Sequence, residues 1–168
     1  MNRTIIATVI LAAFLVASAF ARSVHNRVTS EIRALSVALE SYKTDHGHYP
    51  IDAGTTQKLN PRVAFDPALY IPASHFLYRE LSGDADGDPS TTSPNDKKRY
   101  FEFSPRMLRS FGSSRTTYIA DPWGNSYGYS TSKLAYSNDT AGYNVGFNLW
   151  STGGGTTQED RTKWWTNW

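Results

Sequence analysis

The pattern of apolar and polar positions divides the first fifty residues into two helical segments. Residues 4–21, TIIATVILAAFLVASAFA, contain no charged side chain. Residues 28–42 then carry apolar side chains at spacings of four, three, four and three, as on one face of a helix; they are Val28, Ile32, Leu35, Leu39 and Tyr42. The intervening positions are expected to face water; they hold Arg27, Ser30, Glu31, Arg33, Glu40 and Lys43.

No Pro or Gly separates the two segments, so the simplest prediction is one unbroken helix from Thr4 to Asp45, on the order of 60 Å long. The segment His46–Pro50 ends it, because Gly47 can adopt a left-handed conformation and Pro50 prevents the helix from resuming. We interpret the two histidines here as loop residues, since no third metal ligand lies nearby in the sequence.

Residues 1–21 allow two interpretations. Arg3 before an apolar run that ends in small residues is typical of a cleavable secretory signal. About eighteen apolar residues also reach the lower limit for a membrane-spanning helix, and the basic start favours a cytoplasmic N-terminus. Because the helical pattern continues without a break, we predict a retained transmembrane half at 1–21. The head domain is then 22–168 and includes the amphipathic half of the helix, 22–46.

The rest of the chain indicates a small sheet with long loops. Residues 51–75 are expected to form an irregular connection, and a short helix follows at 75–81. Strands are predicted where β-branched and aromatic residues cluster or alternate with polar ones, and the turn 121–125 should make 117–130 a hairpin; the predicted strands are 100–103, 116–120, 127–130 and 143–150. The predicted class is α+β, with the long helix packed on an antiparallel sheet.

Composition narrows the functional classes. A length of 168 residues accommodates one ordinary domain, and 17 basic against 15 acidic residues give no field that would attract nucleic acid. The chain has no cysteine, which excludes disulfides, thiolate nucleophiles and cysteine-ligated zinc. It also contains no recognisable nucleotide-binding or hydrolase motif, so we predict that it is not an enzyme.

An acidic loop offers the first candidate metal site. Asp84, Asp86 and Asp88 alternate like the first three calcium ligands of an EF-hand loop. Pro89 stands where that loop has its glycine, and Asn95 stands where it has its last carboxylate. A calcium site and a solvated acidic loop therefore both remain open.

The order of these features resembles the major pseudopilins of type II secretion systems, which belong to the type IV pilin-like family. Four segments carry the likeness, and they are Tyr42–Pro50, Asp121–Tyr127, Phe147–Gly153 and Asn167–Trp168. The resemblance implies a type IV pilin-like fold, a single-pass anchor in the inner membrane and a C-terminal domain in the periplasm. It also implies a helical filament of many copies that helps to export folded proteins. Its further partners would be minor pseudopilins and the inner-membrane secretion platform.

The resemblance also implies a calcium site in the loop after the last long strand. Its ligands here would come from Leu149, Thr152, Glu159 and Asp160, although the family has an Asp where this chain has Gly155. No Gly-Phe-Thr-Leu-Ile-Glu processing motif precedes the apolar run, so an atypical or truncated N-terminus is expected. The alternative function is a secreted or periplasmic aromatic-rich binding domain with a cleaved signal peptide.

Overall fold

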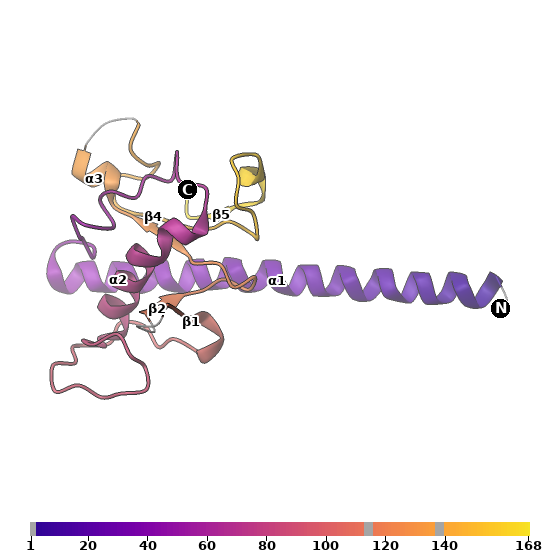
Figure 1. Cartoon of the computed structure of the whole chain (residues 1–168), viewed down its shortest axis with the longest axis horizontal. Helices are drawn as coiled ribbons and strands as arrows, with labels where there is room; N and C mark the ends of the chain where they lie inside the picture. Colours follow the sequence, from indigo (N-terminus) through magenta and orange to yellow (C-terminus); the bar gives the residue numbers. More distant parts are fainter. Residues whose placement is uncertain (1–2, 113–115, 137–139) are drawn as a thin grey trace.

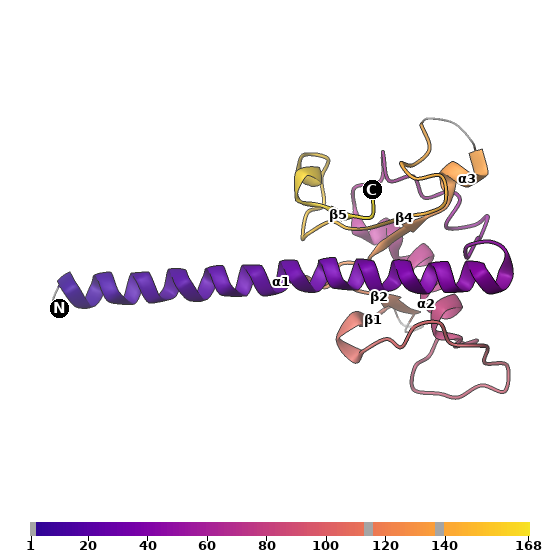
Figure 2. The ribbon, with the colours of Figure 1, turned by 180° about the vertical axis from the view of Figure 1, so that it is seen from behind.

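A single long helix runs the length of the molecule, and a head of short elements packs on one side of its C-terminal half (Figure 1). The computed structural model describes residues 3–112, 116–136 and 140–168, with the backbone alone for residues 3–20. Helix α1 (Arg3–His46) has 44 residues and is therefore about 66 Å long. Figure 2 shows from behind that its N-terminal half stands clear of the head. The prediction of an unbroken helix is confirmed.

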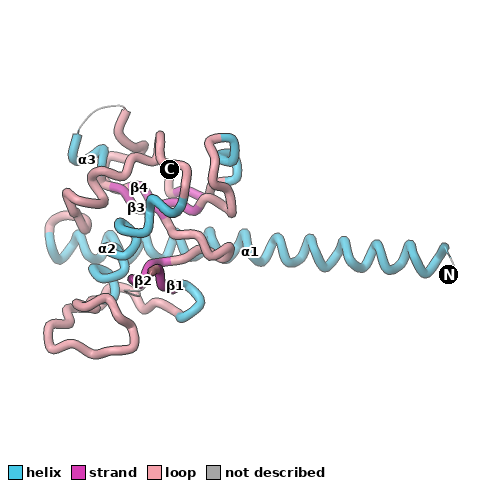
Figure 3. Tube along the Cα trace, in the orientation of Figure 1, coloured by secondary structure: helices cyan, strands magenta, loops and turns pink. Residues whose placement is uncertain are grey.

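The head consists of short helices and strands joined by long loops, as the tube in Figure 3 shows. Its helices are η1 (Pro67–Tyr70), α2 (Ile71–Ser82), η2 (Pro105–Met107), α3 (Ser132–Tyr136) and η3 (Glu159–Lys163). Its strands are β1 (Leu108–Phe111), β2 (Thr116–Ile119), β3 (Gly128–Ser130), β4 (Asn148–Ser151) and β5 (Trp165–Thr166). The class is α+β, as predicted.

The strands form two small antiparallel sheets, β1-β2 and β3-β4-β5. The chain passes from one sheet to the other through the turn 121–125, where Ala120 and Ser126 form an isolated antiparallel bridge. The predicted hairpin over 117–130 is therefore right about the reversal of the chain. The predicted pairing is confined to the residues beside the turn, because β2 pairs with β1 and β3 pairs with β4.

Two predicted strands differ from the structure. Strand β4 begins only at Asn148, because Asn148 Oδ1 accepts hydrogen bonds from the backbone N–H groups of Tyr143 and Asn144 and holds the preceding residues in a turn. Residues 100–103 form no strand, since the N–H groups of Tyr100 and Phe101 both donate to the carbonyl of Leu81 at the end of α2.

Helix α2 starts four residues before the predicted segment. Pro72 lies in its first turn, where a missing N–H costs no helical hydrogen bond. Gly83 ends the helix with φ of +75° and donates its N–H to the carbonyl of Arg79. The helix therefore ends at Ser82, one residue after the predicted segment.

The core joins α1 to both sheets and to α2. All five residues of the predicted apolar stripe, Val28, Ile32, Leu35, Leu39 and Tyr42, are at most 7% exposed. They pack with residues of α2 and of the sheets, among them Leu77, Leu81, Ile119 and Leu149. Each fully buried leucine contributes about 1.5–3 kcal/mol relative to an exposed one. The amphipathic half of α1 is therefore part of the core of the head.

Candidate functional site

The N-terminal half of α1 is the first candidate functional element. Its backbone is helical from Arg3 and extends beyond the head (Figure 1). In the described part of the chain, no helix has the length and hydropathy of a membrane span. The predicted membrane half, 1–21, falls mainly on residues 1–20, whose side chains lie outside the described residues.

A buried carboxylate joins the other half of α1 to the head. Glu31 is 8% exposed, although its position was predicted to face water. It accepts a hydrogen bond of 2.8 Å from the hydroxyl of Tyr127, which precedes β3, and one of 2.7 Å from Arg27 Nε. The correction has a simple geometric reason, because residue 31 lies three positions after Val28 and four before Leu35 and so shares their face.

The turn between the two sheets is organised by Asp121, which is 1% exposed. One carboxylate oxygen accepts the N–H groups of Trp123 and Asn125, and the other accepts the hydroxyl of Ser151 at 2.6 Å. Burial raises the pKa of Asp121 above its ordinary value, and these hydrogen bonds oppose that shift. Asp121 therefore ties the turn to strand β4 and leaves little room for an added ligand.

The C-terminal loop holds the candidate calcium ligands, and most of them already have partners. The carbonyl of Leu149 accepts the N–H of Asn167, and the carbonyl of Thr152 accepts the N–H of Gly155. Glu159 is exposed. One feature fits a ligand, because Thr152 Oγ1 is buried and has no hydrogen-bond partner in the described part of the molecule.

The carboxylate of Asp160 accepts four hydrogen bonds from other residues of this loop. Its Oδ2 atom accepts hydrogen bonds from the N–H groups of Thr156 and Thr157 and from the hydroxyl of Thr157. Its Oδ1 atom accepts a hydrogen bond of 2.7 Å from Lys163 Nζ. The Lys163 ammonium and the Thr157 hydroxyl hold the pKa of Asp160 well below its usual range. Both oxygens of the predicted metal ligand thus face hydrogen-bond donors.

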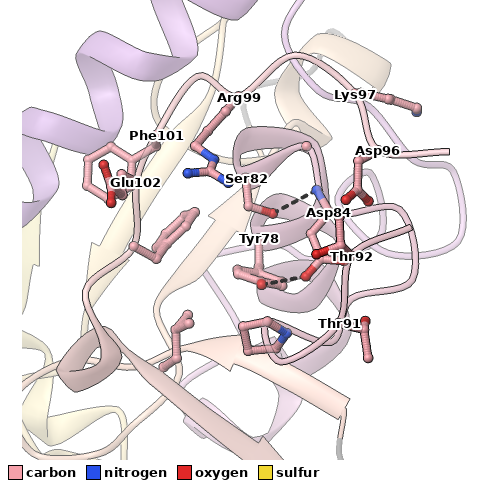
Figure 4. A pocket seen from close by; sticks show the side chains of 14 residues that line it. Tyr78, Ser82, Asp84, Thr91, Thr92, Asp96, Lys97, Arg99, Phe101 and Glu102 are labelled. Carbon is pink, nitrogen blue, oxygen red and sulfur yellow. Dashed lines mark hydrogen bonds between the residues drawn. The ribbon is translucent and has the colours of Figure 1, made fainter. Parts of the chain in front are cut away.

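The acidic loop lies beside a cavity of about 410 Å³ between α2 and the segment that leads to β1 (Figure 4). Asp84 accepts the hydroxyl of Tyr78 at 2.7 Å and the N–H of Gly87 at 2.8 Å. Asp86 accepts the N–H of Asp88, and Asp88 accepts the hydroxyl of Ser90. The three carboxylates shape their own turns, each through different donors.

The C-terminal loop and the acidic loop both lack a cluster of three side chains that could hold a metal ion, within the part of the chain that the structure describes. Across residues 3–112, 116–136 and 140–168, no three His, Cys, Asp or Glu side chains lie together as a metal-binding group. His46 and His48, interpreted above as loop residues, each direct Nδ1 to a backbone carbonyl, that of Tyr42 and that of Tyr49 respectively.

Sequence reasoning missed the two side chains that complete these polar networks. Glu31 was assigned to the wet face, although its spacing from the apolar stripe indicates burial. Lys163 follows Asp160 by three residues, a spacing at which side chains meet on a helical turn. That spacing was a usable signal, but it requires knowing that residues 159–163 form η3.

Comparison of the chain with family models, with curated proteins and with solved structures gives no significant match.

Proposed function

We propose that this chain is a non-enzymatic, pilin-like structural subunit that assembles through α1 with other copies of itself in a helical filament. The filament would be of the type II secretion pseudopilus kind and would help to export folded proteins from the periplasm. The single observation that carries this proposal is the division of α1 into a half that the head covers and a half that extends beyond it.

The contacts of the covered half support a role for the helix in transmitting force to the head. Its apolar stripe is buried, and Glu31 and Arg27 add polar contacts to the head. A force applied to α1 would therefore pass directly into the head. The buried carboxylates Glu31 and Asp121 are used by hydrogen bonds within the fold, which supports a structural role over a catalytic one.

The extended half supports anchoring and assembly. Residues 4–21 carry no charge, and burial of such a surface in a bilayer or between neighbouring helices is strongly favoured. We propose a single-pass anchor in the inner membrane with the head in the periplasm. By resemblance, minor pseudopilins and the inner-membrane secretion platform would be its further partners.

The absence of cysteine makes a direct test simple. Single cysteines are introduced across residues 10–17 of the full chain, and intact membranes are treated with a short bis-maleimide. Covalent dimers are expected at the positions of one helix face. Val63→Cys, on a head residue that is 70% exposed, controls for reactivity and random collision. A monomeric chain in the soluble fraction, with no dimer at any position above this control, would refute the proposal.

N-terminal sequencing tests the alternative of a secreted binding domain with a cleaved signal peptide. N-terminal sequencing of exported protein would then begin at Arg22, after removal of residues 1–21. The unbroken course of α1 across Ala21 supports the retained helix, because a cleaved signal normally precedes an unrelated start of the mature protein.

A further inference from the structure

The C-terminal loop contains a positive charge where the resemblance to pseudopilins expects a calcium ion. Lys163 Nζ lies 2.7 Å from Asp160 Oδ1, the distance of a charge-assisted hydrogen bond. We propose that Lys163 is the cation that pairs with Asp160 in this loop and that the loop keeps its conformation without calcium. This assignment concerns the loop alone and does not depend on filament assembly.

The geometry of Gly155 supports the exchange of a metal for a side chain. A Cβ atom at this position would lie 2.3 Å from Asp160 Cβ and 2.8 Å from Asp160 Cγ. The side chain of Asp160 therefore fills the space that a residue larger than glycine would need at 155. An aspartate at 155, which the resemblance expects, and Asp160 in its present position exclude each other.

The carbonyl oxygens of the predicted ligand set already accept hydrogen bonds within the protein. Calcium takes six to eight oxygen ligands at about 2.3–2.6 Å. Both carbonyls of the predicted set accept backbone N–H groups, from Asn167 and from Gly155. A calcium ion at Asp160 would also face the donors of Thr157 and Lys163, whose positive ends point at the same carboxylate. The ion would have to displace them.

Four donors within the protein hold this loop around Asp160. Two backbone N–H groups, one hydroxyl and one ammonium converge on Asp160 from residues 156, 157 and 163. Lys163 thereby connects the end of η3 to its first turn. If the chain forms a filament, the same arrangement predicts that the heads stay folded in calcium-free medium.

The test compares the full chain in detergent with Lys163→Met, which keeps the length of the side chain and removes its charge. Thermal midpoints are measured in millimolar calcium and in EGTA, and the pKa of Asp160 is measured by carboxyl NMR. The unchanged chain should give equal midpoints and show no calcium binding by calorimetry. Lys163→Met should move the pKa of Asp160 up toward its ordinary value, and Lys163→Arg should keep it low.

A matched control is available elsewhere on the head. Lys98 pairs with Asp45 and is 66% exposed, against 62% for Lys163. Lys98→Met should leave the pKa of Asp160 unchanged. Calcium binding by the unchanged chain, with a rise in its midpoint, would overturn the proposal and would direct attention to Thr152 Oγ1. An Asp160 pKa that Lys163→Met does not move would also overturn it, and this measurement needs no filament.

Discussion

Glu31 tests how firmly the helix and the head are joined. Glu31→Ala removes the acceptor of the Tyr127 hydroxyl, which is fully buried, and the partner of Arg27. Loss of one member of a buried charged pair costs about 3–5 kcal/mol. The Arg27 side chain is 26% exposed and can reach water, so the expected loss lies at the lower end of this range, about 3 kcal/mol. For a chain of this length, that loss lowers the thermal midpoint by about 6–12 °C.

Glu40 provides a control on the same helix. Its carboxylate accepts the hydroxyl of Tyr49 at 2.8 Å, the same distance as in the pair of Glu31 with Tyr127, but Glu40 is exposed. Glu40→Ala is expected to cost about 1 kcal/mol or less, because water replaces the lost hydrogen bond. Both substitutions remove a carboxylate that accepts a tyrosine hydroxyl at the same distance. They differ in the burial of that carboxylate and in the ion pair that Glu31 makes with Arg27.

The assay is urea unfolding of the full chain in detergent, with the free energy of unfolding taken from the midpoint and slope. The double variant of Glu31→Ala with Tyr127→Phe should be more stable than the sum of the two single losses predicts, because the residues share one hydrogen bond. Equal losses for Glu31→Ala and Glu40→Ala would refute the reasoning, since burial would then not decide the cost.

Two further predictions concern the turn and the sheet. Because burial raises the pKa of Asp121, its contribution to stability is complete below the ordinary pKa of aspartate and declines as pH rises through the raised value. Asp121→Asn should remove that decline when the free energy of unfolding is measured against pH. An unchanged pH dependence in this variant would contradict the prediction. Gly128→Ala would bring a Cβ within 2.1 Å of the buried Trp150 ring and should cost about 3 kcal/mol, near the upper end for overpacking. Gly124→Ala meets no atom within 4 Å and carries only the strain of φ at +87°, about 1–2 kcal/mol, so similar thermal midpoints for the two variants would argue against the close packing.

The helical part of the fold could be predicted because its signals are local. The apolar stripe from Val28 to Tyr42 has the period of a helix, and Gly47 and Gly83 take the left-handed conformation that ends α1 and α2. Glu31 was misplaced for a different reason. The charge of Glu31 on the apolar face is satisfied by Arg27 and by Tyr127, which lies 96 residues away in the sequence.

The sheets were harder to predict because their partners are set by distant or side-chain contacts. The alternating pattern from Tyr143 onward has the period of a strand, but Asn148 turns its first residues back through its own side chain. Similarly, the aromatic run at 100–103 is held by the end of α2 at Leu81. The candidate calcium site in the C-terminal loop was predicted from the resemblance alone. The contacts of the Asp160 carboxylate and the role of Lys163 cannot be predicted from sequence spacing without the loop geometry.

The covered half of α1 also sets an order for folding. Its contacts reach Tyr127 and Trp165, which lie 96 and 140 residues from Glu31 and His25 in the chain. Synthesis therefore produces the apolar stripe of the helix long before the surfaces that cover it. Contacts so distant in sequence slow folding and leave the apolar, aggregation-prone stripe of α1 exposed until they form. The stripe is fully covered only after the head has been synthesised as far as Leu149 in β4.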